Sequence, residues 1–249
     1  TMSFEDAENY WEEICSEYCV FAKTLLDYRQ SLMDTTSILR FPFDTIRPGQ
    51  KEFMKKALLA LNSGEAFFVE APTGIGKTVS TLYPAIKGLV KNRYDKIFYL
   101  TAKEATRGVA ESTLNQMRKQ GLIIRSITLR SKEKMCPYGT ECDSKFCPLA
   151  KDYYGKLKDA LAESLVLDEI TPEKITEIAL RHGICPHEFM IDTMNYCTVI
   201  IGDYNHIFSP RVSLIEKDPG NQRVAVLVDE AHNMIDRGRD MFSASFSLS

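Results

Sequence analysis

The stretch Ala71-Pro72-Thr73-Gly74-Ile75-Gly76-Lys77-Thr78 decides how this chain folds. It follows an apolar run at residues 66–69 and precedes a segment of helical character at residues 79–90, the strand, loop and helix order that a phosphate-binding loop needs. The glycines let the backbone curl so that N–H groups face phosphates, and the helix start adds partial positive charge. Lys77 can reach the β- and γ-phosphates of a nucleotide, and Thr78 can ligate Mg²⁺. The alternative is a glycine-rich turn with a chance Lys-Thr pair, which this flanking pattern disfavours.

A second motif lies far downstream of the first. Residues 224–228 (Val-Ala-Val-Leu-Val) form a continuous apolar run typical of a buried parallel strand, and Asp229-Glu230-Ala231-His232 follow it. Asp229 can hold Mg²⁺ through water, Glu230 can polarise an attacking water, and His232 can sense the phosphates. An acidic helix start is the alternative reading. Together with the first motif, these residues predict a site that binds and hydrolyses ATP, with four catalytic candidates: Lys77, Asp229, Glu230 and His232.

The composition is that of an ordinary globular protein, with 249 residues, 44% hydrophobic and 26% charged. No apolar run approaches the ~20 residues of a membrane span, and the acidic N-terminus does not resemble a signal peptide. We therefore expect a cytoplasmic protein without a membrane partner. In a reducing compartment, the seven cysteines suggest metal or cluster ligation more than disulfides.

Charge is distributed unevenly around a net value of −3. Residues 1–40 carry eight acids against three bases, whereas residues 121–158 carry eight bases against four acids. If any part of the chain contacts a polyanion, the basic segment is the one expected to do so. Its bases are Arg125, Arg130, Lys132, Lys134, Lys145, Lys151, Lys156 and Lys158.

Strands alternate with helices along the chain. Besides the run at 66–69, apolar stretches predict strands at residues 96–100, 123–129, 198–201 and 224–228, and helical spacing predicts helices at 5–38, 45–62 and 104–119. This alternation predicts an α/β fold with a doubly wound parallel sheet of the RecA-like type, which binds ligands at the carboxyl ends of its strands. Thr101–Lys103 and Asp203–Asn205 fall at such ends. We expect a helical extension at 1–40, a lobe at 41–249 and an insertion within it at 132–190, where the alternation breaks.

Gln50 lies in the stretch Arg47-Pro48-Gly49-Gln50, upstream of the phosphate-binding loop. Its amide can pair with adenine through one donor and one acceptor. A surface glutamine is an equally good reading from the spacing.

The insertion contains four cysteines, Cys136, Cys142, Cys147 and Cys185, with the spacing C-x5-C-x4-C-x37-C. This spacing is looser than that of most structural zinc sites, and a four-thiolate iron–sulfur cluster tolerates it. Zinc and four unrelated free thiols remain alternatives, and Cys197 is a rival fourth ligand. Bases and tyrosines near these cysteines suit a nucleic-acid strand, although a solvated basic face is the plainer reading. They include Arg130, Lys132, Lys134, Lys145, Lys151, Tyr153 and Tyr154.

Taken together, residues 41–249 resemble the first motor lobe of the XPD/DinG-like iron–sulfur DEAH-box DNA helicases of superfamily two, and the bacterial DinG-like members in particular. The stretches that carry the resemblance are Arg47–Gln50, the Walker A loop 71–78, Phe98–Lys103 with Thr106-Arg107, the four cysteines, Gly202–Asn205 and the DEAH box 229–232.

The resemblance implies a 5′-to-3′ translocase on single-stranded or forked DNA, acting in DNA repair, that uses ATP and Mg²⁺. It implies a [4Fe–4S] cluster on Cys136, Cys142, Cys147 and Cys185, and adenine recognition by Gln50. Thr78 and Asp229 would serve Mg²⁺. Thr101, Lys103 and Arg107 fall in motifs that follow the DNA backbone, but Glu104 stands where the resemblance leads us to expect Thr.

The resemblance also implies a second motor lobe that supplies an arginine finger, and we expect that lobe to be missing from these 249 residues. An arginine finger contributes roughly 10³–10⁵ in rate, so we expect weak nucleotide binding and no unwinding by the chain alone. Two other classes remain: a single-lobe module that binds nucleotide or DNA without turnover, and an iron–sulfur electron carrier gated by ATP.

Overall fold

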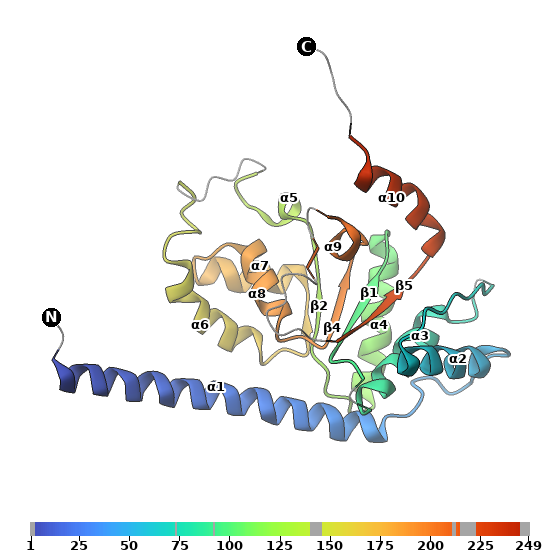
Figure 1. The fold of residues 1–249 in the computed structure, drawn as a ribbon, viewed down its shortest axis with the longest axis horizontal. Coiled ribbons are helices and arrows are strands. Elements are labelled where there is room, and N and C mark those ends of the chain that lie inside the picture. The colour runs from blue at the N-terminus through green and yellow to red at the C-terminus, as the bar shows by residue number, and fades with distance from the viewer. Residues whose placement is uncertain are drawn as a thin grey trace, which may run out of the picture.

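The computed structural model describes residues 3–72, 74–91, 93–139, 146–210, 213–214 and 223–244. These residues form an α/β fold around one parallel sheet of five strands in the order β3-β2-β4-β1-β5 (Figure 1). The strands are β1 (Lys96–Leu100), β2 (Ser126–Thr128), β3 (Glu169–Ile170), β4 (Val199–Gly202) and β5 (Val224–Val228). The predicted α/β class and parallel sheet are confirmed.

Helices flank the sheet on both faces. They are α1 (Phe4–Ile38), α2 (Gln50–Ser63), α3 (Lys77–Leu89), α4 (Glu104–Lys119), α5 (Lys132–Met135), α6 (Tyr153–Ser164), α7 (Pro172–Arg181), α8 (Pro186–Met194), α9 (Asn205–Phe208), the 3₁₀ turn η1 (Ala231–Asn233) and α10 (Met234–Phe242). Within the described part of the chain, no helix is long and apolar enough to cross a membrane.

Side chains of the central strand β1 alternate between two hydrophobic cores. Ile97 and Tyr99 pack with α3, α4 and the end of α1, whereas Phe98 and Leu100 pack with α6, α7 and α8. All five residues of β1 are buried, as expected for a parallel strand covered on both faces. In register, Leu100 pairs with Gly202 on one side and Val228 on the other, so these three strands end at one edge.

The predicted strand at residues 66–69 is wrong. Residues 65–70 have no regular secondary structure, and Phe68 is 87% exposed. A strand needs a neighbour to take up its backbone hydrogen bonds. Among the described residues, β5 pairs with β1 alone, and its other edge faces residues 65–71 across a groove of about 850 Å³ instead of pairing with them.

The insertion at 132–190 is mainly helical, and it also contributes to the sheet. β3 pairs in parallel with β2 through Ser126 to Glu169 and Ile127 to Ile170, a contact that the sequence did not predict. Helix α7 begins with a capped N-terminus, since the Thr171 hydroxyl accepts a hydrogen bond from the Lys174 N–H at 3.4 Å and Pro172 occupies the first turn.

Helix α1 is one continuous helix, and its C-terminal half is fixed to the body of the fold. The Tyr28 hydroxyl bonds to Thr198 at 2.7 Å and accepts the Arg125 N–H at 2.8 Å. The Lys87 ammonium donates to the carbonyls of Thr36 and Ser37, both at 2.9 Å. This lysine from α3 therefore supplies positive charge at a helix end that has no base of its own.

Candidate nucleotide and nucleic-acid site

The phosphate-binding loop ends where α3 begins, at Lys77. Gly76 adopts φ +83°, and a Cβ there would lie 2.8 Å from the Gln50 Nε2 atom, so glycine permits both the turn and the close approach. The Lys77 ammonium donates to the Ala71 carbonyl at 3.2 Å and so folds back over the loop. Thr73, which we predicted as part of this site, lies outside the described residues.

Gln50 is buried, with 2% of its surface exposed, so the surface-glutamine alternative is wrong. Its Oε1 accepts the Arg47 N–H at 3.0 Å, and its Nε2 donates to the Ile75 carbonyl at 3.1 Å. In this conformation the amide fixes the Arg47 turn to the phosphate-binding loop.

Asp229 and Glu230 follow β5 at the edge where β1 and β4 also end. The Asp229 N–H donates to the Leu100 carbonyl at 2.9 Å, and the Glu230 N–H donates to Asp229 Oδ1 at 3.1 Å. Glu230 adopts φ +52°, a left-handed conformation that is rare outside glycine and costs on the order of 1–3 kcal/mol. The Glu230 carboxylate lies 3.9 Å from the Lys77 ammonium and 3.4 Å from the exposed His232 ring.

Tyr99 joins the two motifs. Its hydroxyl lies 3.0 Å from Asp229 Oδ2 and 3.3 Å from Thr78 Oγ1. Burial and the nearby Asp229 raise the pKa of Tyr99 far above its ordinary value, so the phenol stays protonated and donates. The two residues expected to serve Mg²⁺ are therefore held on either side of one hydroxyl.

A groove of about 850 Å³ lies between the phosphate-binding loop and β5. Its polar end is lined by Lys77, Asp229, Glu230 and His232, and its apolar end by Phe53, Phe67 and Val226. The four catalytic candidates from the sequence therefore line one groove.

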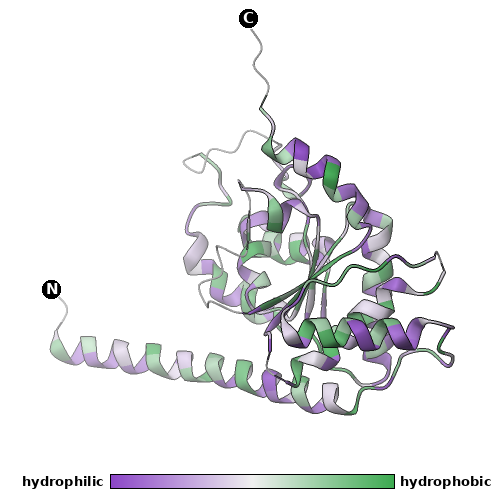
Figure 2. Cartoon of the chain, turned by 45° about the vertical axis from the view of Figure 1, so that its right-hand side comes forward, coloured by the Kyte–Doolittle hydropathy of each residue, from purple (hydrophilic) through white to green (hydrophobic). Residues whose placement is uncertain are grey.

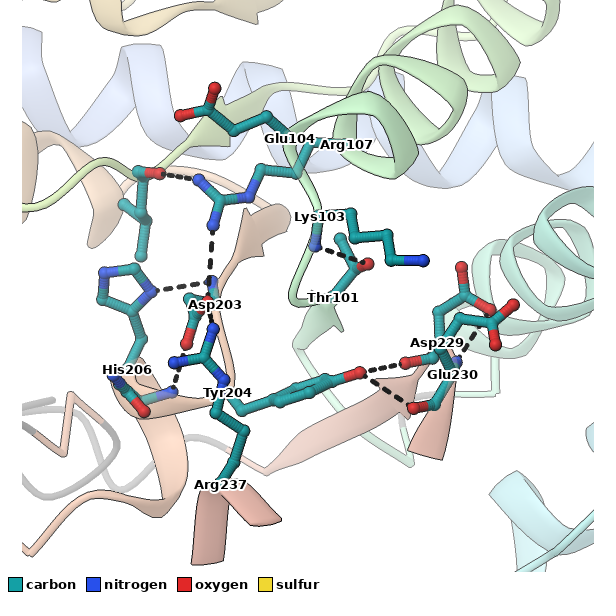
Figure 3. A network of polar contacts seen from close by, with 12 residues as sticks. Thr101, Lys103, Glu104, Arg107, Asp203, Tyr204, His206, Asp229, Glu230 and Arg237 are labelled. Atoms are coloured by element: carbon teal, nitrogen blue, oxygen red, sulfur yellow. Dashed lines mark hydrogen bonds and ion pairs between the residues drawn. The ribbon is translucent and has the colours of Figure 1, made fainter. Parts of the chain in front are cut away.

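The residues predicted to follow DNA are partly buried. Thr101 is 1% exposed, and its hydroxyl accepts the Lys103 N–H at 3.5 Å. Arg107 points inward, donating to the Leu129 carbonyl at 3.3 Å and pairing with Asp203 at 3.6 Å (Figure 3). Lys103 is exposed at the start of α4. In this conformation Thr101 and Arg107 form hydrogen bonds and ion pairs within the protein at the strand ends. Of these three residues, Lys103 is the one exposed to a ligand.

Asp203 forms ion pairs with two arginines, Arg107 and Arg237 of α10, the latter at 3.9 Å. Next to it, Tyr204 extends from the end of β4 toward the other motif (Figure 3), donating to the Asp229 carbonyl and lying 3.2 Å from that of Glu230. The segments that follow β1, β4 and β5 are therefore linked by side chains.

His206 is part of the same network. Its Nδ1 accepts the Asp203 N–H at 3.0 Å, and a Cβ at Gly202 would lie 2.7 Å from this nitrogen. Burial lowers the pKa of His206 to about 4, so the ring is neutral at neutral pH. The ring is therefore part of the packed network at the strand ends.

The remaining basic candidates differ in exposure. Arg130 pairs with Glu173 at 3.1 Å, and Lys134 pairs with Glu104 at 2.7 Å. Lys132 is half-buried in α5. Arg125, counted in the basic segment, is buried: it donates to the carbonyls of Tyr196 and Leu165 and does not form part of a surface.

The two tyrosines of α6 have different environments. The Tyr153 hydroxyl donates to Asp192 at 2.7 Å, whereas Tyr154 is 83% exposed and packs edge-on against the Tyr153 ring at 5.3 Å. Tyr154 therefore presents the more exposed ring, whereas the hydroxyl of the half-buried Tyr153 is engaged by Asp192.

Three of the four candidate cysteine ligands can be described. Cys136 ends α5, Cys185 precedes α8 and Cys147 lies in a turn, and all three are free and half-buried. Helix α5 packs against α8, and burial raises the pKa of the Cys185 thiol, with Cys147 close enough to add to the rise. Cys142 lies outside the described residues. Among the residues described, no three His, Cys, Asp or Glu side chains come together closely enough to hold a metal ion.

Sequence reasoning missed three contributors to this site. Tyr99 lies inside a buried strand, where an aromatic residue is expected to pack in the hydrophobic core. Tyr204 follows a strand, and the sequence does not indicate which residue its hydroxyl contacts. Arg237 follows the second motif on an amphipathic helix and carries no signal of its own. The sequence cue for Tyr99 and Tyr204 was their place in the stretches Phe98–Lys103 and Gly202–Asn205, which carry the family resemblance.

Comparisons with known proteins agree with this geometry. The sequence model of the DEAD_2 family matches residues 100–249, and that of the DEAD/DEAH box helicases matches residues 47–140. The general transcription and DNA repair factor IIH helicase subunit XPD of Dictyostelium discoideum is 23% identical over 229 residues, covering 79% of this chain and 29% of the relative. The XPD/RAD3 subunit of Saccharomyces cerevisiae is 24% identical over 232 residues, covering 78% of this chain and 29% of the relative.

A solved XPD helicase chain shares the fold, with a TM-score of 0.55 at 22% identity, over 80% of this chain and 35% of that one. The chain thus spans about 29% of the length of these curated relatives. Its parallel sheet is consistent with a RecA-like helicase lobe. On the extent of the family match, the chain belongs to the DEAD_2 family of XPD-like DEAD/DEAH-box helicases.

Proposed function

We propose that residues 41–249 are the nucleotide-binding first motor lobe of an ATP-dependent DNA helicase that moves 5′-to-3′ on single-stranded DNA, of the bacterial DinG-like kind. The observation that carries the proposal is the Tyr99 hydroxyl between Thr78 and Asp229. It brings the end of the phosphate-binding loop and the acidic motif to one point, as ATP hydrolysis requires.

Each polar residue of the groove then has a task. Lys77 exchanges its contact with the Ala71 carbonyl for the β- and γ-phosphates, and Thr78 and Asp229 hold Mg²⁺. Glu230 orients the attacking water and accepts its proton, and its distance to Lys77 is short enough for both to act on the same phosphate. His232, on the exposed rim, is suited to contact a neighbouring lobe.

Gln50 has a modified task in this proposal. Because both ends of its amide bond to backbone, adenine recognition requires the amide to leave Ile75 or Arg47. Without that change, Gln50 supports the loop that holds the phosphates.

A [4Fe–4S] cluster on Cys136, Cys142, Cys147 and Cys185 is part of the proposal. Thiols are the ligands that such a cluster takes, and Cys136 and Cys185 adjoin α5 and α8, which pack against each other. When bound, the cluster would cross-link α5, the turn at Cys147 and the start of α8. Iron and sulfide analysis of anaerobically purified protein tests this part: about four irons per chain are expected, and a colourless protein containing zinc or no metal would contradict it.

A DNA strand would run past exposed groups near the ends of β1 and β2, where Lys103 and Lys134 lie, toward Tyr154 on α6. Ammonium groups neutralise phosphates and an exposed ring stacks on bases, which suits single-stranded DNA.

Because the chain spans less than a third of its relatives' length, we expect a second lobe to supply the opposite wall of the groove. Titration with fluorescent mant-ATP and Mg²⁺ tests the site in this chain. We expect weak binding of mant-ATP. Lys77→Ala should abolish this binding, whereas Lys55→Ala, at an exposed residue of α2, should leave it unchanged. Equal binding by both variants would refute the site, and binding without hydrolysis or strand displacement would fit one lobe acting as a nucleotide-binding module.

A further inference from the structure

A stripe of large apolar side chains runs along the first half of α1. Phe4, Trp11, Ile14 and Tyr18 are spaced by seven, three and four residues, which places them on one face of the helix. They are between 39% and 84% exposed. We call these four residues the N-terminal stripe.

The same face continues into the buried half of the helix. Three residues after Tyr18, Phe21 packs edge-on against Tyr196 at 5.5 Å. Tyr28 and Leu32, seven and eleven residues after Phe21, contact the body of the fold. The N-terminal stripe is thus an extension of an established packing face, and it continues beyond the part of the fold that covers that face.

Two views of the molecule agree on this arrangement. In Figures 1 and 2 the first half of α1 projects away from the sheet and its helices. Exposed aromatic residues gathered on one helix face mark an interaction surface more often than scattered single residues do.

Charge identifies the kind of partner. Residues 3–22 contain six acids and no Lys, Arg or His, and the acids are Glu5, Asp6, Glu8, Glu12, Glu13 and Glu17. A second copy docked through this segment would place twelve carboxylates together, because each copy brings six. A base is the favourable neighbour for these acids, as the ion pair of Glu17 with Lys158 of α6 illustrates.

We propose that the N-terminal stripe binds a basic amphipathic helix of another protein. Its apolar face would cover Trp11, Ile14 and Tyr18 in the manner of a short coiled coil, and its lysines and arginines would pair with the flanking carboxylates. The proposal does not depend on nucleotide binding. The N-terminal stripe lies toward the free end of α1, away from the start of α3, where the phosphate-binding loop ends (Figure 1).

Trp11 is the single tryptophan of the chain and lies within the stripe, so its fluorescence reports docking directly. The probe is a three-heptad peptide without aromatic residues, with Leu at the core positions and Lys at the flanking ones, and its control carries Glu in place of Lys. The Lys peptide is expected to shift the Trp11 emission to shorter wavelength and to bind at least about tenfold more tightly than the Glu peptide, with a gap that narrows in high salt.

A matched pair of variants locates the contact. Tyr18 and Val20 are similarly exposed, at 69% and 66%, but only Tyr18 belongs to the stripe. Tyr18→Ser is expected to weaken Lys-peptide binding and Val20→Ser to leave it unchanged. Both sites are exposed on α1, so folding is preserved and is checked by circular dichroism. The proposal is overturned if neither peptide binds, if both bind equally, if the two variants behave alike, or if the Trp11 emission shifts with protein concentration alone, which would indicate a second copy.

Discussion

Tyr204 at the end of β4 donates a hydrogen bond to the backbone carbonyl of Asp229, and its hydroxyl lies 3.2 Å from that of Glu230. This contact spans two strand ends and supports Glu230 in its left-handed conformation, φ +52°. The conformation is costly for a residue with a side chain, so the supporting bonds determine whether it persists.

Removing the Tyr204 hydroxyl should therefore loosen the acidic motif. We expect Tyr204→Phe to lower the free energy of unfolding by ~1 kcal/mol and to speed amide hydrogen exchange at residues 230–233. The control is Tyr94→Phe, which loses a buried hydroxyl bond to the Ala85 carbonyl at 2.6 Å, away from the motif. If both variants speed exchange at 230–233 equally, Tyr204 has no specific role there.

Tyr99→Phe should change the response of the site to magnesium. The hydroxyl orients Asp229 and Thr78 toward one another, and its loss removes a bond of ~1 kcal/mol, which corresponds to about a fivefold change in affinity. We expect mant-ADP affinity to fall by this factor in Mg²⁺ and to stay constant in EDTA. An equal loss in both buffers would mean that Tyr99 supports the fold and not the magnesium ligands.

Gly76 and Gly74 form a matched pair within the phosphate-binding loop. Both have positive φ, +83° and +87°, but a Cβ at 76 would lie 2.8 Å from Gln50 Nε2, whereas a Cβ at 74 meets nothing within 4 Å. We expect Gly76→Ala to cost ~1 kcal/mol more than Gly74→Ala in urea unfolding, because it also displaces the Gln50 amide from the Ile75 carbonyl. Introducing Gln50→Ala into both variants should remove this difference, and a difference that persists would contradict the explanation.

The lowered pKa of His206 should make the free energy of unfolding depend on pH. Its pKa is lowered by burial from 6.5 to about 4, with nearby Asp203 opposing the shift and Arg107 adding to it. Between these values the unfolded chain binds a proton that the folded chain does not, so the free energy of unfolding rises with pH across this window. The contribution is complete above pH 6.5 and is lost as the pH falls toward 4.

The contribution of His206 to the pH dependence of stability is obtained by comparing the wild type with a variant that lacks the imidazole. We expect lowering the pH from 7 to 5 to cost the wild type ~2 kcal/mol more than it costs His206→Gln, whose amide oxygen can still accept the Asp203 N–H. Urea unfolding at the two pH values measures this. Parallel losses in the two proteins would show that His206 does not titrate in this range.

The parts of the fold that could be predicted are those fixed by local pattern. β1 and β5 were predicted with the bounds that the structure has, because each is a continuous apolar run between polar residues. Helix α3 was predicted at 79–90 and begins two residues earlier, at Lys77, directly after the glycine turn. The Thr171 cap of α7 likewise follows from chemistry that acts over a few residues.

The predictions that failed depend on tertiary neighbours. Residues 66–69 have the composition of a strand, but strand formation needs a paired backbone that the described chain does not provide. Conversely, β3 is two residues long and forms because β2 lies beside it. The burial of Arg125, Thr101 and Arg107 could not be read from residue type, since polar residues are buried only where partners happen to meet them.

The central claim is that the loop at 71–78 and the motif at 229–232 form one nucleotide site. Hydrogen–deuterium exchange with and without MgATP tests it most directly. We predict that amides at residues 74–80 and 229–233 both gain protection, that α1 does not, and that Lys77→Ala abolishes both gains together. Protection of one segment without the other, or of neither at saturating MgATP, would contradict the account.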